Sequence, residues 1–171
     1  MESDIFSKKT VFFDEFLKLK SDSLNGNLIK QQKLEQRRKW FESALSSTKT
    51  CDIVFLDPDN GLEIKSEKEF QSKGPKYTYY HELGKFIERG QSTIVYHHIC
   101  RNGTAYEQIH ERCSEIKNKL KVENVFSLLY KRGTLRVFFV LPNKQHKDVL
   151  LSRCKKLVES NVWAKHFELI I

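Results

Sequence analysis

The segment Leu56-Asp57-Pro58-Asp59-Asn60-Gly61-Leu62-Glu63 gathers four oxygen-bearing side chains within seven residues, namely Asp57, Asp59, Asn60 and Glu63. Gly61 permits a sharp backbone turn among them. Such a cluster could hold Mg²⁺ through Asp57, Asp59 and Glu63, orient a nucleobase amine, or exchange protons as a catalytic acid or base. The alternative is a loop in which Asp and Asn side chains only make turn hydrogen bonds.

A second group of polar residues follows in Tyr96-His97-His98-Ile99-Cys100-Arg101. Side chains alternate along a strand, so we expect only one of His97 and His98 to face the Asp57 cluster as a catalytic residue. The candidates for substrate binding are residues whose types suit base stacking and phosphate contacts, although solvated surface residues would look the same. They are Lys76, Tyr79, Tyr80, Arg101 and Arg132.

The elements that must position these residues follow from periodicity and from turn residues. Apolar spacing predicts helices over 8–20, 29–46, 78–89, 104–120 and 142–159, the fourth begun by a capping box at Thr104 and Glu107. Short apolar runs predict strands over 52–57, 93–98, 124–130, 134–141 and 166–171. The order predicts a single α/β domain over 1–171, with a helical part at 1–50 and a sheet-forming part at 51–171.

The expected architecture is a Rossmann-like three-layer domain with a mostly parallel sheet and a C-terminal antiparallel hairpin. The carboxyl ends of neighbouring parallel strands lie at the same edge of a sheet, where ligands bind in open α/β folds. We therefore expect Asp57, Asp59, Asn60, Glu63, one of the two histidines and Arg101 to converge there.

Composition narrows the class of protein. The chain has 171 residues, with 30 Lys+Arg against 22 Asp+Glu, and residues 101–171 alone carry 14 basic and 7 acidic side chains. This balance permits nucleic-acid binding. No apolar run approaches the roughly 20 residues of a membrane-spanning helix, the start is polar, and the 4 Cys lack CxxC spacing. We expect a cytoplasmic protein with reduced thiols and no membrane association.

The blocks CDIVFLDPDNGLE, GPKY, HEL, RGQSTIVYHH with Arg101, and RGTLRVFFV occur here in this order. Over roughly residues 37–141 they resemble a family of bacterial proteins whose activity is not characterised. This resemblance implies no function.

The element order also resembles the carboxyl-terminal half of Rossmann-like S-adenosylmethionine-dependent methyltransferases. In that family a strand ends in an Asp-Pro-Pro-Tyr-type motif that places the target amino group, and Asp57-Pro58-Asp59-Asn60 stands at the matching place. The resemblance implies that Asp57 and Asn60 contact the target. Asp59 and Asn60 replace the second Pro and the aromatic residue, and no strand with a Gly-rich turn precedes the motif.

Three functions remain. The first is a nucleic-acid-associated protein related to these methyltransferases, with S-adenosylmethionine as the cofactor that the resemblance suggests. The second is a metal-dependent phosphodiesterase in which Asp57, Asp59 and Glu63 bind Mg²⁺ and a histidine moves protons. The third is a non-catalytic module that acts with a protein partner or as an oligomer.

Overall fold

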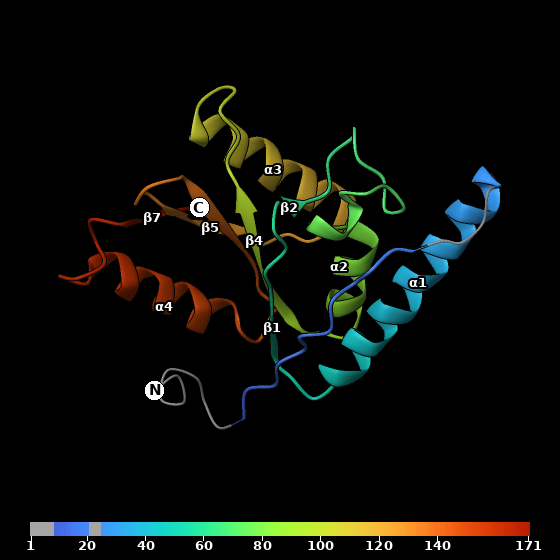
Figure 1. The fold of residues 1–171 in the computed structure, drawn as a ribbon. Helices are drawn as coiled ribbons and strands as arrows, with labels where there is room; N and C mark the ends of the chain where they lie inside the picture. Colours follow the sequence, from blue (N-terminus) through green and yellow to red (C-terminus); the bar gives the residue numbers. More distant parts are fainter. Residues whose placement is uncertain (1–8, 21–24) are drawn as a thin grey trace. The chain divides into compact units, whose positions relative to one another are not determined.

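The structure is a computed structural model that describes residues 9–20 and 25–171 (Figure 1). Four α-helices, one short 3₁₀ helix and seven strands lie in the described residues. In chain order they are α1 (Gly26–Ser47), β1 (Ile53–Leu56), β2 (Gly61–Leu62), η1 (Gly74–Lys76), β3 (Tyr77–Thr78), α2 (Tyr80–Glu88), β4 (Ser92–His98), α3 (Ala105–Leu120), β5 (Phe126–Tyr130), β6 (Arg136–Leu141), α4 (Lys147–Glu159) and β7 (Phe167–Ile170). No described helix is long and apolar enough to cross a membrane.

The chain divides into two compact units, residues 1–51 and 52–171, and each is described by itself. The boundary coincides with the change from the helical part to the sheet-forming part of the sequence. The single-domain interpretation stays a prediction.

In the first unit the predicted helix over 8–20 is wrong, because residues 9–20 form neither helix nor strand. Side chains of α1 hold this segment instead. The Gln36 side chain bonds the backbone N–H and C=O of Lys20 at 2.9 and 2.8 Å, and the Trp40 indole N–H donates to the Glu15 carbonyl at 2.7 Å. Bonds from another element therefore take the place of the bonds within a helix, which apolar spacing alone does not anticipate.

In the second unit the main sheet has the strand order β1-β4-β6-β5-β7. β1 and β4 pair in parallel, as predicted, while β4–β6, β6–β5 and β5–β7 are antiparallel. The α/β class is thus confirmed, and the expectation of a mostly parallel sheet is wrong. The predicted hairpin of β5 and β6 is present, but β6 inserts between β4 and β5 and so reverses the strand direction beside β4.

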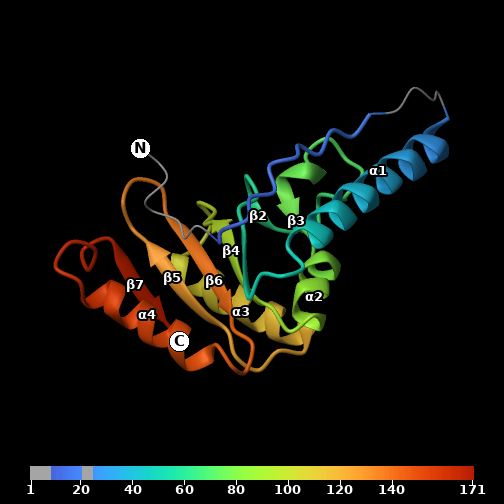
Figure 2. The same cartoon turned by 90° about the horizontal axis from the view of Figure 1, so that it is seen from below.

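Helices cover both faces of this sheet (Figures 1 and 2). α2 and α3 pack on one face, where Leu83, Ile109 and Ile116 join buried residues of β4, β5 and β6 in the larger core. α4 packs on the opposite face, where Cys154 lies against Phe126 and its neighbours. We call these the α2/α3 face and the α4 face.

Candidate functional site

The strand register arranges the α4 face of the sheet in rows of side chains. One row contains Phe55, Ile94, Val140 and Phe126, which are register partners across four strands. The next row contains Tyr96, Phe138, Leu128 and Leu169, and the third contains His98, Arg136, Tyr130 and Phe167. Asp57, one residue past the pair Leu56–Val95, continues the second row toward the β1 edge.

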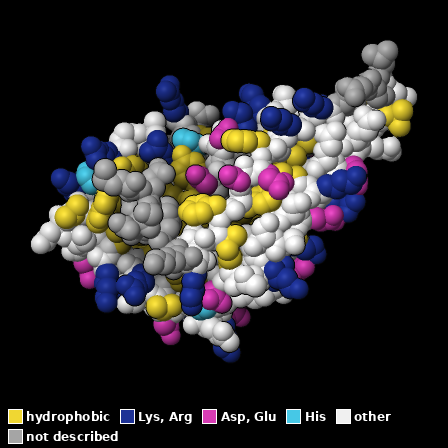
Figure 3. Space-filling view, turned by 60° about the horizontal axis from the view of Figure 1, so that its bottom comes forward, with side chains coloured by type: hydrophobic (Ala, Val, Ile, Leu, Met, Phe, Trp, Pro, Cys, Tyr) yellow, Lys and Arg dark blue, Asp and Glu magenta, His cyan; other side chains and the backbone are white. Residues whose placement is uncertain are grey.

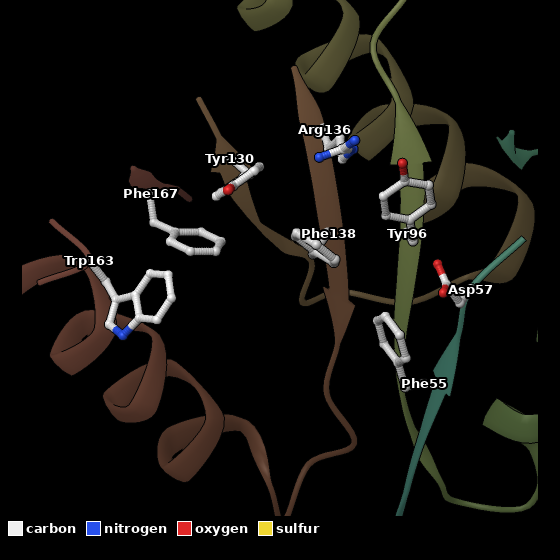
Figure 4. Close-up of a pocket in the computed structure, with 8 residues that line it drawn as sticks. All are labelled: Phe55, Asp57, Tyr96, Tyr130, Arg136, Phe138, Trp163 and Phe167. Atoms are coloured by element: carbon white, nitrogen blue, oxygen red, sulfur yellow. The ribbon is translucent and has the colours of Figure 1, made fainter. Parts of the chain in front are cut away.

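A hollow of about 520 Å³ lies over these rows (Figure 4). Its lining combines six aromatic side chains with one acidic and one basic group: Phe55, Tyr96, Tyr130, Phe138, Trp163, Phe167, Asp57 and Arg136. α4 ends at Glu159, and the segment after it brings Trp163 to the rim. The hollow is open, since Phe55 is 54% exposed and Trp163 is 45% exposed.

The aromatic rings of the hollow contact one another at tilted or edge-to-face angles. The Phe167 ring centroid lies 4.9 Å from that of Tyr130, 6.1 Å from that of Trp163 and 6.4 Å from that of Phe138. The Tyr96 and Phe138 centroids are 5.7 Å apart. These separations are typical of favourable aromatic pairs, and the packing fixes the rings while their outer surfaces stay open to a ligand.

Two opposite charges line the hollow without neutralising each other. Among the described residues neither the Asp57 carboxylate nor the Arg136 guanidinium has a hydrogen bond or an ion pair, and the guanidinium lies 6.0 Å from the centroid of the Tyr130 ring. The Tyr96 hydroxyl is already engaged with His98 Nε2 at 2.9 Å. The hollow therefore offers a planar ligand apolar surfaces for stacking, one strong acceptor and one strong donor.

His97 and His98 lie on opposite faces of β4, as the alternation of the strand predicts. His98 faces the hollow side, where it bonds Tyr96 and is the register partner of Arg136. His97 lies on the α2/α3 face, 6% exposed, where its Nδ1 accepts the Leu62 N–H at 3.0 Å. Burial, with a smaller contribution from the positive charge of Arg112, lowers the pKa of His97 to about 4.

Gly61 explains how the acidic loop reaches His97. Its φ is +110°, and a Cβ built there would lie 2.1 Å from His97 Nδ1 and 2.7 Å from His97 Cα. Only glycine fits this backbone conformation at so close an approach. The loop is fixed further by the His98 N–H, which donates to the Asn60 carbonyl at 3.3 Å. His97 and Gly61 thus hold the loop that carries Asp57, and His97 is a neutral structural residue.

The three carboxylates predicted to bind a metal point in different directions, so their predicted convergence is wrong. Asp57 lines the hollow, whereas the Asp59 carboxylate pairs with Lys76 at 3.2 Å on the surface. Glu63 accepts the Tyr80 N–H at 3.0 Å and pairs with Lys119 at 3.0 Å. Across the part of the chain that the structure describes, no three His, Cys, Asp or Glu side chains form a group that could hold a metal ion.

Glu63 has a structural function on the α2/α3 face. Its side chain bonds the first turn of α2, and its backbone carbonyl accepts from Arg112 on α3 at 3.1 Å. Lys119 pairs with both Glu63 and Glu115, which raises the pKa of Lys119 despite the opposing effect of desolvation. This network ties the loop to both helices of one face and leaves Glu63 away from the hollow.

The remaining predicted residues also lie outside the hollow. Tyr80 is 5% exposed in the larger core, burial raises its pKa, and its ring lies 4.3 Å below the Lys119 ammonium. Tyr79 is buried at the start of α2, where its backbone N–H donates to Glu82. Arg101 and Arg132 are exposed, one in the loop after β4 and one in the hairpin loop.

The sequence interpretation therefore placed Asp57 in the site and missed the aromatic residues and Arg136. Alternation along the predicted strands 124–130 and 134–141 places Tyr130, Arg136 and Phe138 on one face of the hairpin. This pattern is the sequence feature that indicates these three residues as neighbours. Trp163 and Phe167 carried no such signal, because their position depends on where α4 ends and on the pairing of β7 with β5.

Comparison of the chain with family models, with curated proteins and with solved structures finds no match.

Proposed function

We propose that this protein binds nucleic acid by stacking a base of a single strand in the hollow of the α4 face. The observation that carries the proposal is the lining of the hollow, in which six aromatic rings accompany a carboxylate and a guanidinium that have no hydrogen bond or ion pair with other described residues. Aromatic side chains on an open sheet face are the usual platforms for unpaired bases. Asp57 accepts a hydrogen bond from a base amine, which is the same contact that the methyltransferase resemblance implies for it.

Positive charge beside the hollow supports the same ligand. His166 lies between Tyr130 and Trp163, with ring centroids 6.4 and 6.5 Å away. Desolvation, followed by the charges of Lys165 and Arg132, lowers the pKa of His166. Lys165 and Arg132 thus act on a residue whose ring contacts two rings of the hollow, and such cations would attract the phosphates of a bound strand. Figure 3 shows exposed hydrophobic side chains with both acidic and basic side chains around them.

The proposal is limited to binding and includes no methyl transfer. β1, α2, β4, α3 and the β5–β6 hairpin follow the element order of the methyltransferase half, and Asp57 directly follows β1, where the motif stands. The residues do not fit a donor site, however. Asn25-Gly26-Asn27 starts α1, with the Asn25 side chain accepting the N–H of Asn27 at 3.0 Å, and the described residues before β1 contain no strand.

Fluorescence anisotropy with a labelled single strand of about eight nucleotides tests the proposal. We expect binding that weakens steeply from about 50 to 200 mM salt, because phosphate contacts release counterions. Trp163→Ala should weaken binding by about ten-fold, as expected for loss of one stacking ring. Val162→Ala is the matched control, since Val162 is an adjacent exposed apolar residue that does not line the hollow.

If none of the single-stranded oligonucleotides binds at the lower salt concentration, the proposal is refuted. Equal weakening by Trp163→Ala and Val162→Ala would also refute it, because binding would then occur elsewhere on the basic surface. Circular dichroism of both variants checks that the fold is unchanged.

A further inference from the structure

Asp57, directly after β1, and Arg136, on β6, approach the hollow from different sides, with the Tyr96 ring between them (Figure 4). An ionised carboxylate only accepts hydrogen bonds, and a guanidinium only donates them. Neither group is satisfied by another described side chain through a hydrogen bond or ion pair. A base stacked on the rings therefore meets an acceptor at one edge and a donor at another.

The strand register sets the distance between these two groups. Asp57 is level with Tyr96, whose register partner is Phe138, and Arg136 lies two residues further along β6. Two strand spacings of about 4.8 Å and two residue rises of about 3.4 Å separate the Cα atoms of Asp57 and Arg136 by about 12 Å. Both side chains extend from these Cα atoms on the face that carries the Tyr96 and Phe138 rings, so a base stacked on the rings has the carboxylate on one side and the guanidinium on another.

The hydrogen-bonding pattern selects between the purines. Guanine presents two adjacent donors, N1–H and the N2 amine, on one edge and two adjacent acceptors, O6 and N7, on another. A carboxylate can accept both donors, and a guanidinium can donate to both acceptors in a bidentate manner. Adenine offers Asp57 a single amine flanked by acceptors, and these would face the carboxylate unfavourably. Cytosine and uracil have no two adjacent donors for the carboxylate.

We propose that the hollow is a guanine site, in which Asp57 binds the N1–H and N2 amine and Arg136 binds O6 and N7. This inference rests on the proposed binding of single-stranded nucleic acid and adds the identity of the base. Tyr96 does not compete for the base edge, because its hydroxyl is bonded to His98. Specificity for guanine thus comes from the two charged groups, whereas the aromatic rings of the hollow can stack on any base.

The test uses oligothymidylate strands of about eight nucleotides that carry one central variable base, measured by fluorescence anisotropy at fixed salt. The variable base is guanine, adenine, cytosine, hypoxanthine, which lacks the N2 amine, or 7-deazaguanine, which lacks the N7 acceptor. We expect the guanine strand to bind about ten-fold or more tightly than the adenine strand. Hypoxanthine and 7-deazaguanine strands should fall between them.

Protein variants assign each contact. The Asp57→Asn variant should bind the guanine and hypoxanthine strands with equal affinity. It should still bind the 7-deazaguanine strand more weakly than the guanine strand. The Arg136→Gln variant should bind the guanine and 7-deazaguanine strands with equal affinity. It should still bind the hypoxanthine strand more weakly than the guanine strand. Asp59→Asn and Arg153→Gln are the matched controls, since both remove the same charge from exposed positions outside the hollow and should keep the full preference.

Equal binding of the guanine and adenine strands would overturn the guanine site while leaving single-strand binding intact. A preference that survives both Asp57→Asn and Arg136→Gln would also overturn it. Absence of binding to every strand, including plain oligothymidylate, would instead refute the underlying function. The outcomes are therefore distinguishable within one assay.

Discussion

Protonation of His97 should destabilise the second unit. The side chain is buried on the α2/α3 face, and its unprotonated Nδ1 is the acceptor for the Leu62 N–H. A proton on Nδ1 would remove that acceptor and place a charge beside Phe139, whose ring centroid lies 5.8 Å away. Lowering the pH is therefore the perturbation, and His97 is the group through which it acts.

The pKa values give the magnitude and the sign. The pKa of His97 is about 4 in the folded state, against 6.5 for an ordinary histidine. Between these pH values the unfolded chain binds the proton and the folded chain does not, so stability falls as the pH falls. At about 1.4 kcal/mol per pH unit the interval corresponds to about 3 kcal/mol, present above pH 6.5 and lost by about pH 4.

Urea unfolding followed by circular dichroism at several pH values between 7 and 4 measures this loss. The free energy of unfolding of the wild type should fall about 3 kcal/mol further than that of His97→Asn, whose amide oxygen can accept from Leu62 but does not titrate. His98→Asn keeps His97 and should retain the wild-type dependence on pH. Parallel pH profiles for the wild type and His97→Asn would refute a neutral, buried His97.

Three further predictions follow from the loop that carries Asp57. Gly61→Ala should lower the free energy of unfolding by more than about 2 kcal/mol, measured by urea unfolding, because its Cβ would meet His97; Gly133→Ala has a positive φ but open space and should cost less. Glu63→Gln should cost about 1 kcal/mol in thermal unfolding through loss of the ion pair with Lys119. Added Mg²⁺ should leave the unfolding temperature unchanged, and a rise that grows with Mg²⁺ concentration would contradict the diverging carboxylates.

Local patterns in the sequence were enough to predict most elements of the second unit. The capping box at Thr104 is present, with the Glu107 N–H donating to the Thr104 hydroxyl at 3.2 Å and the Glu107 carboxylate accepting the Thr104 N–H at 3.0 Å. The parallel pair β1–β4 and the hairpin β5–β6 also lie where the apolar runs placed them. The helix start, the hairpin and the limits of each strand depend on residues close together in the chain, so periodicity and turn chemistry predict them. The parallel pairing of β1 with β4 follows from the helix α2 that connects the two strands.

The position of β6 could not be predicted in the same way. Insertion of β6 between β4 and β5 is decided by long-range pairing, such as that of Tyr96 with Phe138, which leaves no local signal. The same pairing brings Arg136 from the carboxyl-terminal part of the chain to the site of Asp57. Local patterns therefore predict Asp57 as a site residue but favour Arg101, instead of Arg136, as its basic neighbour.

The acidic loop was misread because its residue types suggested one shared purpose. Asp57, Asp59 and Glu63 lie within seven residues, yet each is directed to a different neighbour. Asp57 is the last residue to follow the alternation of β1, so it shares the α4 face with Phe55. Beyond it the chain turns toward His97 and α2, and the later carboxylates serve the opposite face.

Strand alternation and the end of α4 together explain why a binding surface exists here. On β4, His97 is committed to the core, while Tyr96 and His98 face the α4 side. α4 and the core around Cys154 cover residues such as Phe126, Leu128 and Val140, and α4 ends at Glu159, whereas Phe55 and Trp163 stay exposed beside the aromatic and charged side chains of the hollow. If the positions of Asp57 and Arg136 were buried in the core, aliphatic residues would be favoured at them, because burying an unpaired charge costs free energy. Arg136 and Asp57 are tolerated because the hollow is open, and that openness gives a stacked base access to both.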